Sequence, residues 1–517
     1  MSKILKLYNT FGRSLNHVEV SGKLVTSPSI TVQPIYGSLY ICGPTVYSDS
    51  HVGHAITYIR ADLFRRFMKS LFNVRLTTVM NITDIDDKIL DKTATELGSL
   101  HNESVEPASH PFNQISEKYY KRFLNDLNNV RAQPADVFVR VSRHVDIIVD
   151  FIRRMEDCGH AYVSPTGDVN FRVRSVHNYI GRIDSRRQNF DNLGKENQCD
   201  FVLWKMAKPG EPVWNYTSAN GTTIPGRPGW HVQCSAISSA FFGERLDFHF
   251  GGKDLIFPHH YNEEACCCAY HKLDTSKSLH VWANNWLHSG HLTIRDAKMS
   301  KSLGNVIKIS DFISRSSVNA LRLLCVRSHY RTDIEYTDEL LERLKGLDHR
   351  INAFSSFLIQ ELRSLQDNSL SQRLYEEVSH DSDIELAIQA TYDRIIDGVC
   401  DDFNLDSGLE SLMDLAKMVY SKDPKAFRAR DLIATWTLLN DWCSTCGLVY
   451  GDASSNSQYI DSLANISTNF RQTVRVWTLD EMKAKGSSPS LQRLLNECDI
   501  ARKQLDELGC VTRDSKT

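Results

Sequence analysis

Hydrophobic and polar positions follow a strand, helix, strand order near the start of the chain. Residues 38–47 and 73–83 are short apolar runs that predict strands, and residues 55–72 between them have the pattern of an amphipathic helix. Such a βαβ unit joins two parallel strands through a helix, and its ligand lies at the strand ends. We therefore expect an α/β fold with a parallel sheet and a ligand at one edge of that sheet.

This alternation is interrupted twice. Residues 101 to about 200 are expected to form an insertion, in which residues 135–155 predict helices. From Asp338, a candidate N-cap, the pattern is helical and one apolar stripe follows. The stripe consists of Leu340, Leu344, Leu347, Ile351, Phe354 and Leu358. These positions predict an all-α C-terminal domain over residues 341–517, whose simplest role is to support its neighbour or to dimerise.

The composition is that of an ordinary globular protein. Of the 517 residues, 41% are hydrophobic and 24% are charged, and the net charge is −3. The charge excludes a generally basic chain, so a nucleic-acid partner would have to contact a local basic surface. Thirteen cysteines without a secretory segment indicate a reducing compartment, and we expect a cytoplasmic protein. No run of about 18 apolar residues is present, so no membrane partner is expected.

One short stretch raises the question of a metal site. Residues 254–270, DLIFPHHYNEEACCCAY, combine histidines, glutamates and three consecutive cysteines. On a helix, His259 and Glu263 project from one face about one turn apart, which makes them a usable pair of ligands. The same spacing is common on solvated helix faces and in helix-internal hydrogen bonds, so the stretch alone leaves both interpretations open. Residues 266–268, all cysteine, are most simply small buried side chains.

Two motifs indicate nucleotide chemistry. Residues 51–54, HVGH, open the first long helix, where glycine lets a base approach the backbone and the helix start favours phosphate. Residues 298–302, KMSKS, place Lys298 and Lys301 in a loop, and two such lysines can clamp a triphosphate. Together, in this order and separated by an insertion, the motifs are far more specific than either is alone.

With these motifs the chain resembles class I aminoacyl-tRNA synthetases, in which His-Ile-Gly-His and Lys-Met-Ser-Lys-Ser signatures flank a split Rossmann fold. The first signature reads His-Val-Gly-His here. The segments CGPTVYSDSHVGH, NITDIDDKI, RPGWHVQCSA, FGGKDLIFPHHYNEE and KMSKSLGN narrow the resemblance to the cysteinyl-tRNA synthetase family, over roughly residues 5–345. It implies a catalytic domain over residues 1–340, with a stem-contact region at roughly 300–340, and a helical tRNA-binding domain over residues 341–517.

The resemblance also implies the site residues. One zinc ion per chain would be held by two thiolates, an imidazole and a carboxylate, a donor set that suits Zn²⁺. These ligands are Cys42, Cys234, His259 and Glu263. The cysteine pocket is expected to contain Gly43, Thr83 and Trp230. The residues expected at the ATP phosphates, the adenosine and the leaving pyrophosphate are His51, Gly53, His54, Gly251, Gly252, Asp254, Lys298 and Lys301.

The implied reaction has two steps. ATP, accompanied by Mg²⁺, and L-cysteine condense to cysteinyl-adenylate, and the terminal ribose hydroxyl of tRNA(Cys) then takes the cysteine, without a covalent enzyme intermediate. A pocket that selects by shape rejects serine by only about 1 to 3 kcal/mol, whereas a metal that binds the substrate thiolate selects by metal affinity.

Other interpretations of the same residues are available. A cysteine ligase that acts on an amino-sugar would keep the zinc and the signatures but lack the helical residues 341–517. A catalytically silent tRNA-binding protein would not need His54 and Lys301. Asp84, Asp86 and Asp87 could bind a divalent metal by charge alone, but helix-start capping is the preferred interpretation. The sequence assigns no oligomeric state.

Overall fold

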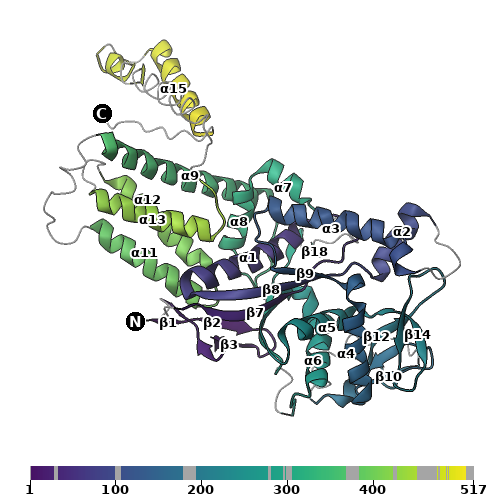
Figure 1. The fold of residues 1–517 in the computed structure, drawn as a ribbon. Coiled ribbons are helices and arrows are strands. Elements are labelled where there is room, and N and C mark those ends of the chain that lie inside the picture. The colour runs from purple at the N-terminus through teal and green to yellow at the C-terminus, as the bar shows by residue number, and fades with distance from the viewer. Residues whose placement is uncertain are drawn as a thin grey trace. The chain divides into compact units, whose positions relative to one another are not determined.

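The chain divides into two compact units. The computed structural model describes residues 2–27, 33–98, 106–177, 194–276, 281–294, 297–298, 306–367, 383–422, 428–450, 474–475, 478–484, 486 and 488–507 (Figure 1). The first unit consists of Met1–Thr337 with Ile396–Asp406, and the second of Asp338–Ile395 with Ser407–Thr517. Residues 396–406, which the sequence pattern assigned to the helical domain, therefore group with the first unit.

A five-stranded parallel sheet forms the centre of the first unit. Its strands, in spatial order, are β16 (Ala283–Ser289), β15 (Leu246–Gly252), β7 (Ile35–Ile41), β8 (Val74–Ile82) and β9 (Val137–Arg140). The chain builds outward from β7 to β9, and then from β15 to β16 in the opposite direction. The strand order therefore reverses between β7 and β15. In open α/β sheets, ligands bind at the carboxyl ends of the strands beside such a reversal.

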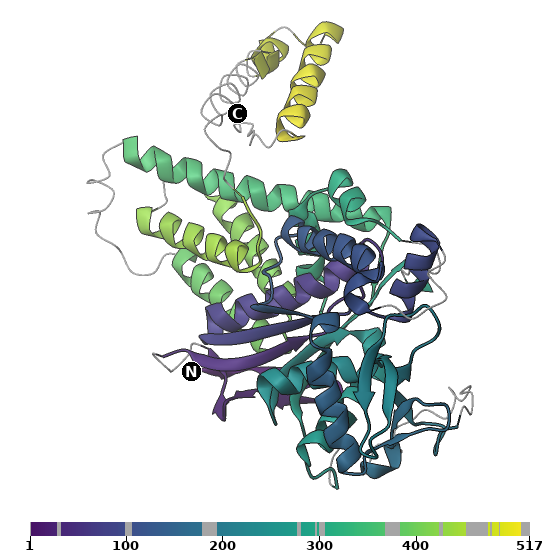
Figure 2. The same cartoon turned by 45° about the vertical axis from the view of Figure 1, so that its right-hand side comes forward.

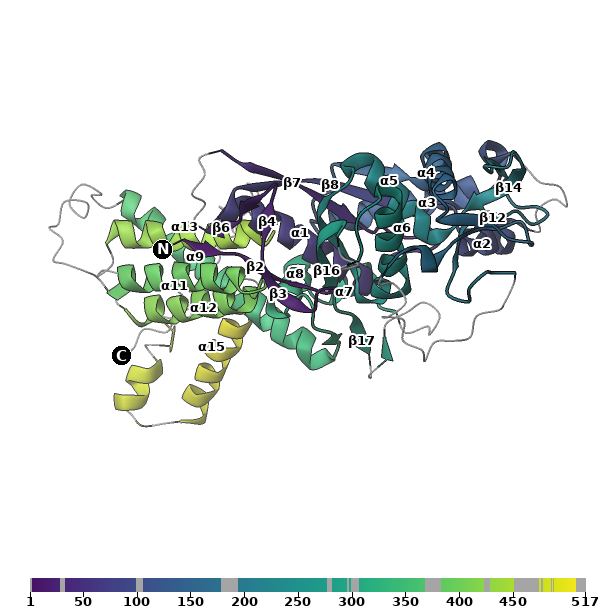
Figure 3. The ribbon, with the colours of Figure 1, turned by 90° about the horizontal axis from the view of Figure 1, so that it is seen from below.

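Helices cover both faces of this sheet. Helix α1 (Val52–Phe72) joins β7 to β8, which confirms the predicted βαβ unit. Helix α6 (Tyr261–His271) joins β15 to β16 and packs on α5 (Trp230–Phe242), as Figure 3 shows from below. Because crossovers are right-handed and the two βαβ units run in opposite directions, α1 and α6 lie on opposite faces. The face covered by α5 and α6 carries the candidate metal ligands.

The connection from β8 to β9 is helical and contains α2 (Asp87–Leu97) and α3 (Phe112–Asn129). The prediction of helices over residues 135–155 is wrong in its first part. Val137–Arg140 form β9, and helix α4 (Val145–Asp157) begins only after a 3-10 turn. Val137, Val139 and Val141 alternate with other residues, and β-branched side chains at this spacing favour a strand.

A second, antiparallel sheet follows α4 (Figure 2). Its strands, in spatial order, are β10 (Ala161–Val163), β11 (Val169–Phe171), β12 (Phe201–Met206), β14 (Thr223–Pro228) and β13 (Trp214–Thr217). The expected insertion, residues 101 to about 200, overlaps this sheet only in part, since residues 137–140 belong to the parallel sheet and the last two strands follow residue 200.

The remaining elements of the first unit are short. Near the N-terminus, the strand pairs are β1 (Lys3–Ile4) with β6 (Thr26–Ser27), β2 (Lys6–Asn9) with β3 (Ser14–His17), and β4 (Glu19–Val20) with β5 (Lys23–Leu24). After β16 come β17 (Leu292–Ile294), β18 (Ala297–Lys298), α7 (Ile309–Arg315), α8 (Val318–Arg327) and β19 (Ile334–Glu335). Strand β17 pairs with both β18 and β19.

The acidic run after β8 has three different roles. Asp86 is the N-cap of α2, since its side chain accepts a hydrogen bond from the Lys88 N–H at 2.9 Å, which confirms the capping prediction for this residue. For Asp84 the prediction is wrong. That carboxylate is fully buried and accepts from Arg140 Nε at 2.8 Å. Asp87 lies in the first turn of α2, where its carboxylate pairs with Lys205.

The second unit is helical in its described part. Its helices are α9 (Asp338–Asp367), α11 (Asp383–Cys400), α12 (Leu405–Ser421), α13 (Ala429–Thr445) and α15 (Pro489–Glu507). Along α9 the predicted stripe is buried except at Leu340, which is half-buried, while its neighbour Leu341 is buried. Helices α9 and α13 pack together. Among the described residues, no helix is both long and apolar enough to cross a bilayer.

Candidate active site

A cavity of about 410 Å³ opens beside the strand-order reversal of the parallel sheet. Its wall is formed by the turns after β7 and β15, the start of α1, the end of β8 and the segment after β16. Eleven of the predicted site residues line it, and they are Cys42, Gly43, His51, Gly53, His54, Thr83, Trp230, Cys234, Gly252, Asp254 and His259. Residues from segments far apart in the sequence thus meet at one edge of the sheet.

The His-Val-Gly-His segment forms the start of α1. His51 is the N-cap, and its ring stacks on the His54 ring with centroids 3.8 Å apart. A Cβ at Gly53 would lie 3.0 Å from the His51 ring, so the absence of a side chain lets the ring fold over the helix start. The helix start and two imidazoles therefore face the cavity together, an arrangement that suits a phosphate.

Gly43 and Thr83 lie side by side above β7 and β8. Asn81 joins them, because its Oδ1 accepts from the Gly43 N–H at 2.9 Å and its Nδ2 donates to Thr83 Oγ1 at 3.2 Å. A Cβ at Gly43 would lie 1.7 Å from the Asn81 carbonyl oxygen, so no other residue fits there without moving the strands. The result is a wall of backbone and small polar groups, which leaves room for a small substrate.

The turn after β15 supplies the opposite wall. Gly252 and Asp254 line the cavity, and Asp254 Oδ1 lies 3.3 Å from His291 Nε2. Gly251 lies one residue earlier, buried against the His260 ring, where a Cβ would approach the ring carbon to 2.5 Å. Gly251 therefore supports the close packing beneath the turn, while its neighbour reaches the wall.

Cys42, Cys234 and His259 line the cavity, and Glu263 converges with them just behind its wall. One ligand atom from each of these side chains lies within 4.8 Å of all the others, and all four residues are buried. The Cys42 sulfur is 3.6 Å from both the Cys234 sulfur and His259 Nε2. Cys42 follows β7, Cys234 lies on α5, His259 lies in the kinked segment Ile256–His260, and Glu263 lies on α6. The structure thus brings together the four residues predicted to bind zinc.

Burial controls the protonation of these groups. Burial raises the pKa of Cys42 and of Glu263 well above their usual values, and it lowers the pKa of His259. Burial alone would also raise the pKa of Cys234, but the Cys42 thiol and the His259 ring lower it to about 7. A neutral imidazole and at least one readily formed thiolate are the protonation states that metal binding requires.

The groups around the quartet fit a metal ion. Glu263 Oε1 lies 2.9 Å from His249 Nε2, whereas Glu263 Oε2 is buried without a hydrogen-bond partner among the described residues. An orphaned carboxylate oxygen is costly unless a cation satisfies it. His259 Nδ1 lies 3.0 Å from His231 Nδ1, and this contact leaves His259 Nε2 free to ligate. Two sulfurs, one imidazole nitrogen and one carboxylate suit Zn²⁺.

A second grouping overlaps the first. Cys42, His249, His260 and Glu263 also place one ligand atom each within 4.8 Å of the others. His260 Nε2 lies 3.3 Å from the Cys42 sulfur, and its Nδ1 lies 2.7 Å from His288 Nε2. The set with two cysteines is the better zinc site, because a second thiolate adds a negative, soft ligand where this grouping offers a second neutral imidazole. His249 and His260 are then partners of the ligands.

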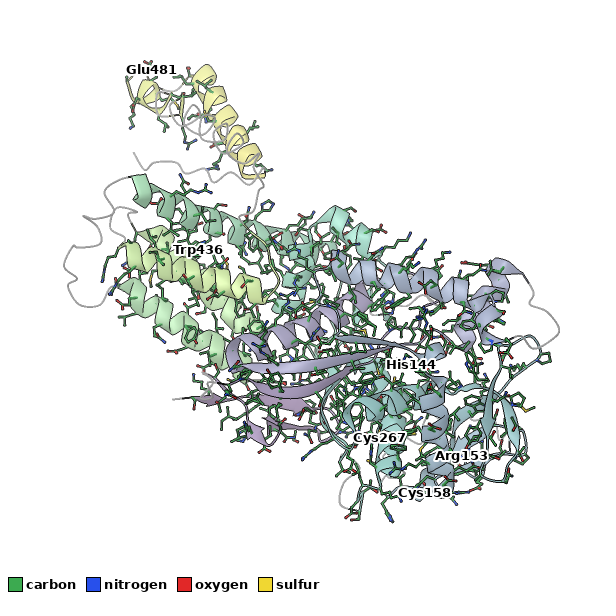
Figure 4. All side chains as sticks on the ribbon, viewed as in Figure 1. His144, Arg153, Cys158, Cys267, Trp436 and Glu481 are labelled. Atoms are coloured by element: carbon green, nitrogen blue, oxygen red, sulfur yellow. The ribbon has the colours of Figure 1, made fainter. Side chains whose placement is uncertain are left out.

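Trp230 lies at the start of α5, and the run of three cysteines lies on α6. Trp230 opens α5, is 40% exposed, and stacks on His259 with ring centroids 4.4 Å apart, so it forms an aromatic wall over that imidazole. Residues 266–268 are fully buried on α6, where Figure 4 labels Cys267, and none of them belongs to either ligand grouping. Their interpretation as small packed side chains agrees with this burial.

The Lys-Met-Ser-Lys-Ser segment lies largely outside the described residues. The backbone of Lys298 belongs to β18, and Lys301 is not among the described residues. Lys88 also lines the cavity and was not predicted from the sequence. It is the only lysine or arginine on the described part of the cavity wall, and its Nζ lies 5.7 Å from the Tyr47 ring centroid. The sequence does mark this position, because Lys88 ends the acidic run that opens α2.

Comparisons with known proteins agree with this geometry. The family model described as the tRNA synthetases class I (C) catalytic domain matches residues 31–346. A cysteine-tRNA ligase of Pyrococcus abyssi is 36% identical over 393 residues, which cover 74% of this chain and 75% of that protein. A cysteine-tRNA ligase of Methanococcus vannielii is 30% identical over 525 residues, which cover 99% of this chain and 98% of that protein.

A likeness in fold extends to other synthetases. The structure of Mycobacterium tuberculosis methionyl-tRNA synthetase in complex with methionyl-adenylate superposes with a TM-score of 0.56 at 16% identity, covering 80% of this chain and 89% of that one. At this identity the likeness shows the α/β fold, with its parallel sheet and helical C-terminal region. The matches in sequence carry the assignment further, and from them we conclude that the chain belongs to the cysteine-tRNA ligase family of class I aminoacyl-tRNA synthetases.

Proposed function

We propose that the protein activates L-cysteine with ATP and transfers it to tRNA(Cys). The observation that carries this proposal is the convergence of Cys42, Cys234, His259 and Glu263, the first three of which line the cavity. This donor set would hold a zinc ion, which when bound supplies a ligand position for the thiolate of the substrate. Serine offers a hydroxyl that resists deprotonation, so cysteine is selected by its sulfur.

Each part of the cavity has a role in the first step. The small polar wall at Gly43 and Thr83 leaves room for the amino acid, and Trp230 closes it on one side. The start of α1, with His51 and His54, binds the phosphates of ATP, which Mg²⁺ accompanies. Catalysis then consists of holding the carboxylate of cysteine in line with the α-phosphate and of stabilising charge as pyrophosphate leaves.

The remaining roles rest on the sequence resemblance. Gly53, Gly252 and Asp254 accommodate the nucleoside, and Gly251 supports the turn that contains Gly252 and Asp254. Lys298 and Lys301 stabilise the leaving pyrophosphate. We place the catalytic domain at residues 1–340, including the stem-contact region at roughly 300–340, and the tRNA-binding domain at residues 341–517.

Exchange of labelled pyrophosphate into ATP tests the first step. The purified chain is expected to catalyse this exchange with cysteine and not with serine. Acid-precipitable cysteine in the presence of bulk tRNA tests the second step and separates a tRNA ligase from a ligase that acts on an amino-sugar. Exchange without an amino acid, or its absence in a chain with confirmed zinc content, would refute the proposal.

A further inference from the structure

Tyr40 lies directly beneath the proposed zinc ligands. Tyr40 lies on β7, and Cys42, two residues later, directly follows the strand and continues its pairing with β15, so the two side chains leave the same face of the sheet. On the neighbouring strand β15 its partner in register is His249, the residue that contacts Glu263, and the rings of Tyr40 and His249 lie 5.3 Å apart. The tyrosine side chain thus rises toward α5 and α6, which carry Cys234 and Glu263.

The Tyr40 hydroxyl is buried among the proposed ligands. The residue is 0% exposed, and its hydroxyl has no well-formed hydrogen bond to any described residue. The ordinary pKa of a tyrosine hydroxyl is about 10, so at neutral pH the hydroxyl is protonated and can donate a hydrogen bond. A buried hydroxyl without a partner costs free energy that phenylalanine at this position would avoid.

We propose that Tyr40 is a positioning residue of the metal centre and that its hydroxyl donates a hydrogen bond to the Cys234 thiolate when the metal is bound. This inference rests on the proposed zinc site. The Cys234 sulfur on α5 lies 3.6 Å from the Cys42 sulfur, over the sheet face from which the Tyr40 side chain rises, and a thiolate accepts hydrogen bonds more strongly than a thiol does. The bond would fix the orientation of the sulfur and disperse some of its charge.

Removing the hydroxyl is therefore expected to weaken metal binding. Loss of a hydrogen-bond partner of a metal ligand lowers metal affinity by about 10-fold or more, and Tyr40→Phe should show a loss of this size for zinc. In the cobalt-substituted protein, the sulfur-to-cobalt charge-transfer band should move to longer wavelength, because a thiolate without its donor gives up charge more readily. Neither readout depends on catalytic activity.

The matched control is Tyr216→Phe. Tyr216 is also fully buried, but it lies on β13 of the antiparallel sheet, and its hydroxyl donates to Glu156. This control loses a buried hydroxyl and a hydrogen bond away from the ligands, so its zinc affinity and cobalt spectrum should equal those of the wild type. A shift in Tyr40→Phe alone would support the inference, whereas equal shifts in both variants would overturn it.

Two further outcomes separate this inference from the proposed function. If the wild type binds zinc and Tyr40→Phe changes neither affinity nor spectrum, Tyr40 has no role and the zinc site survives. If the wild type binds no zinc, the proposed metal centre fails and the inference with it.

Discussion

Replacing Asp62 by alanine tests the buried ion pair that anchors α1, the helix whose start faces the cavity. Asp62 Oδ2 lies 2.6 Å from Arg322 Nη2, and the two side chains are 1% and 0% exposed. Asp62 Oδ1 also accepts from the Gln133 N–H at 3.0 Å and from Arg66 Nε at 2.9 Å. The single carboxylate therefore joins α1, α8 and the segment before β9.

The loss of stability expected for Asp62→Ala follows from the charge that the substitution leaves unpaired. Asp62→Ala leaves the Arg322 guanidinium buried without its carboxylate partner, while its hydrogen bonds to the carbonyl oxygens of Val130 and Arg131, at 3.0 and 3.1 Å, remain. Breaking one side of a buried pair costs about 3 to 5 kcal/mol, because the remaining charge is uncompensated. The double variant Asp62→Leu with Arg322→Met should lose less stability than the two single variants lose together, since it removes both charges.

Hydrogen exchange measured by mass spectrometry on peptides from α1 and α8 is the suitable assay, because a chain with two units has no single free energy of unfolding. The control is Arg327→Ala, which breaks the half-exposed pair of Arg327 with Asp406 and should cost about 1 kcal/mol or less. The buried pair does not anchor α1 if Asp62→Ala loses no more protection from hydrogen exchange than this control. The same holds if the double variant loses as much protection as the two single variants together.

Two further predictions concern other parts of the first unit. Burial lowers the pKa of His110 below 6.5, and the neutral ring bridges the Phe112 N–H at 3.1 Å and the Gly210 carbonyl. Its stabilising effect is therefore complete above pH 6.5 and lost as the pH falls through the lowered pKa, so the difference in thermal stability between wild type and His110→Gln should shrink on acidification. In zinc analysis, alanine at all three of residues 266–268 should leave one equivalent bound, whereas Cys234→Ser should remove most of it. Loss of zinc in the triple alanine variant but not in Cys234→Ser would show that the ligands had been assigned to the wrong cysteines.

The spacing of apolar residues was sufficient to predict the parallel βαβ unit and the long helices. The βαβ unit over residues 35–82 and the long helix from Asp338 both have the expected type, because each buries one face at its own period. The strand at Val137–Arg140 was missed for a physical reason. It adjoins a strong helical pattern, and its pairing partner β8 lies more than fifty residues earlier, where local pattern carries no information.

The candidate site could be predicted only through the motifs. Cys42 and Cys234 are 192 residues apart, and no local pattern indicates that their sulfurs lie 3.6 Å from each other. The spacing of His259 and Glu263 was visible, but it is shared with ordinary helix faces. The positions of Asn81 and Tyr40 depend on the register of neighbouring strands, which becomes evident only once the strands are paired.

The electrostatics of the quartet explain why a buried site of this kind suits a metal ion. Two thiolates and one carboxylate within 4.8 Å would place three negative charges in a region that water hardly reaches. Without a cation, such a set remains largely protonated, which agrees with the raised pKa values of Cys42 and Glu263. A divalent ion compensates most of this charge and displaces the protons. The same burial that opposes ionisation in the free chain therefore strengthens the attraction for a dication, and it keeps water from competing for the ligand position that we assign to the thiolate of the substrate.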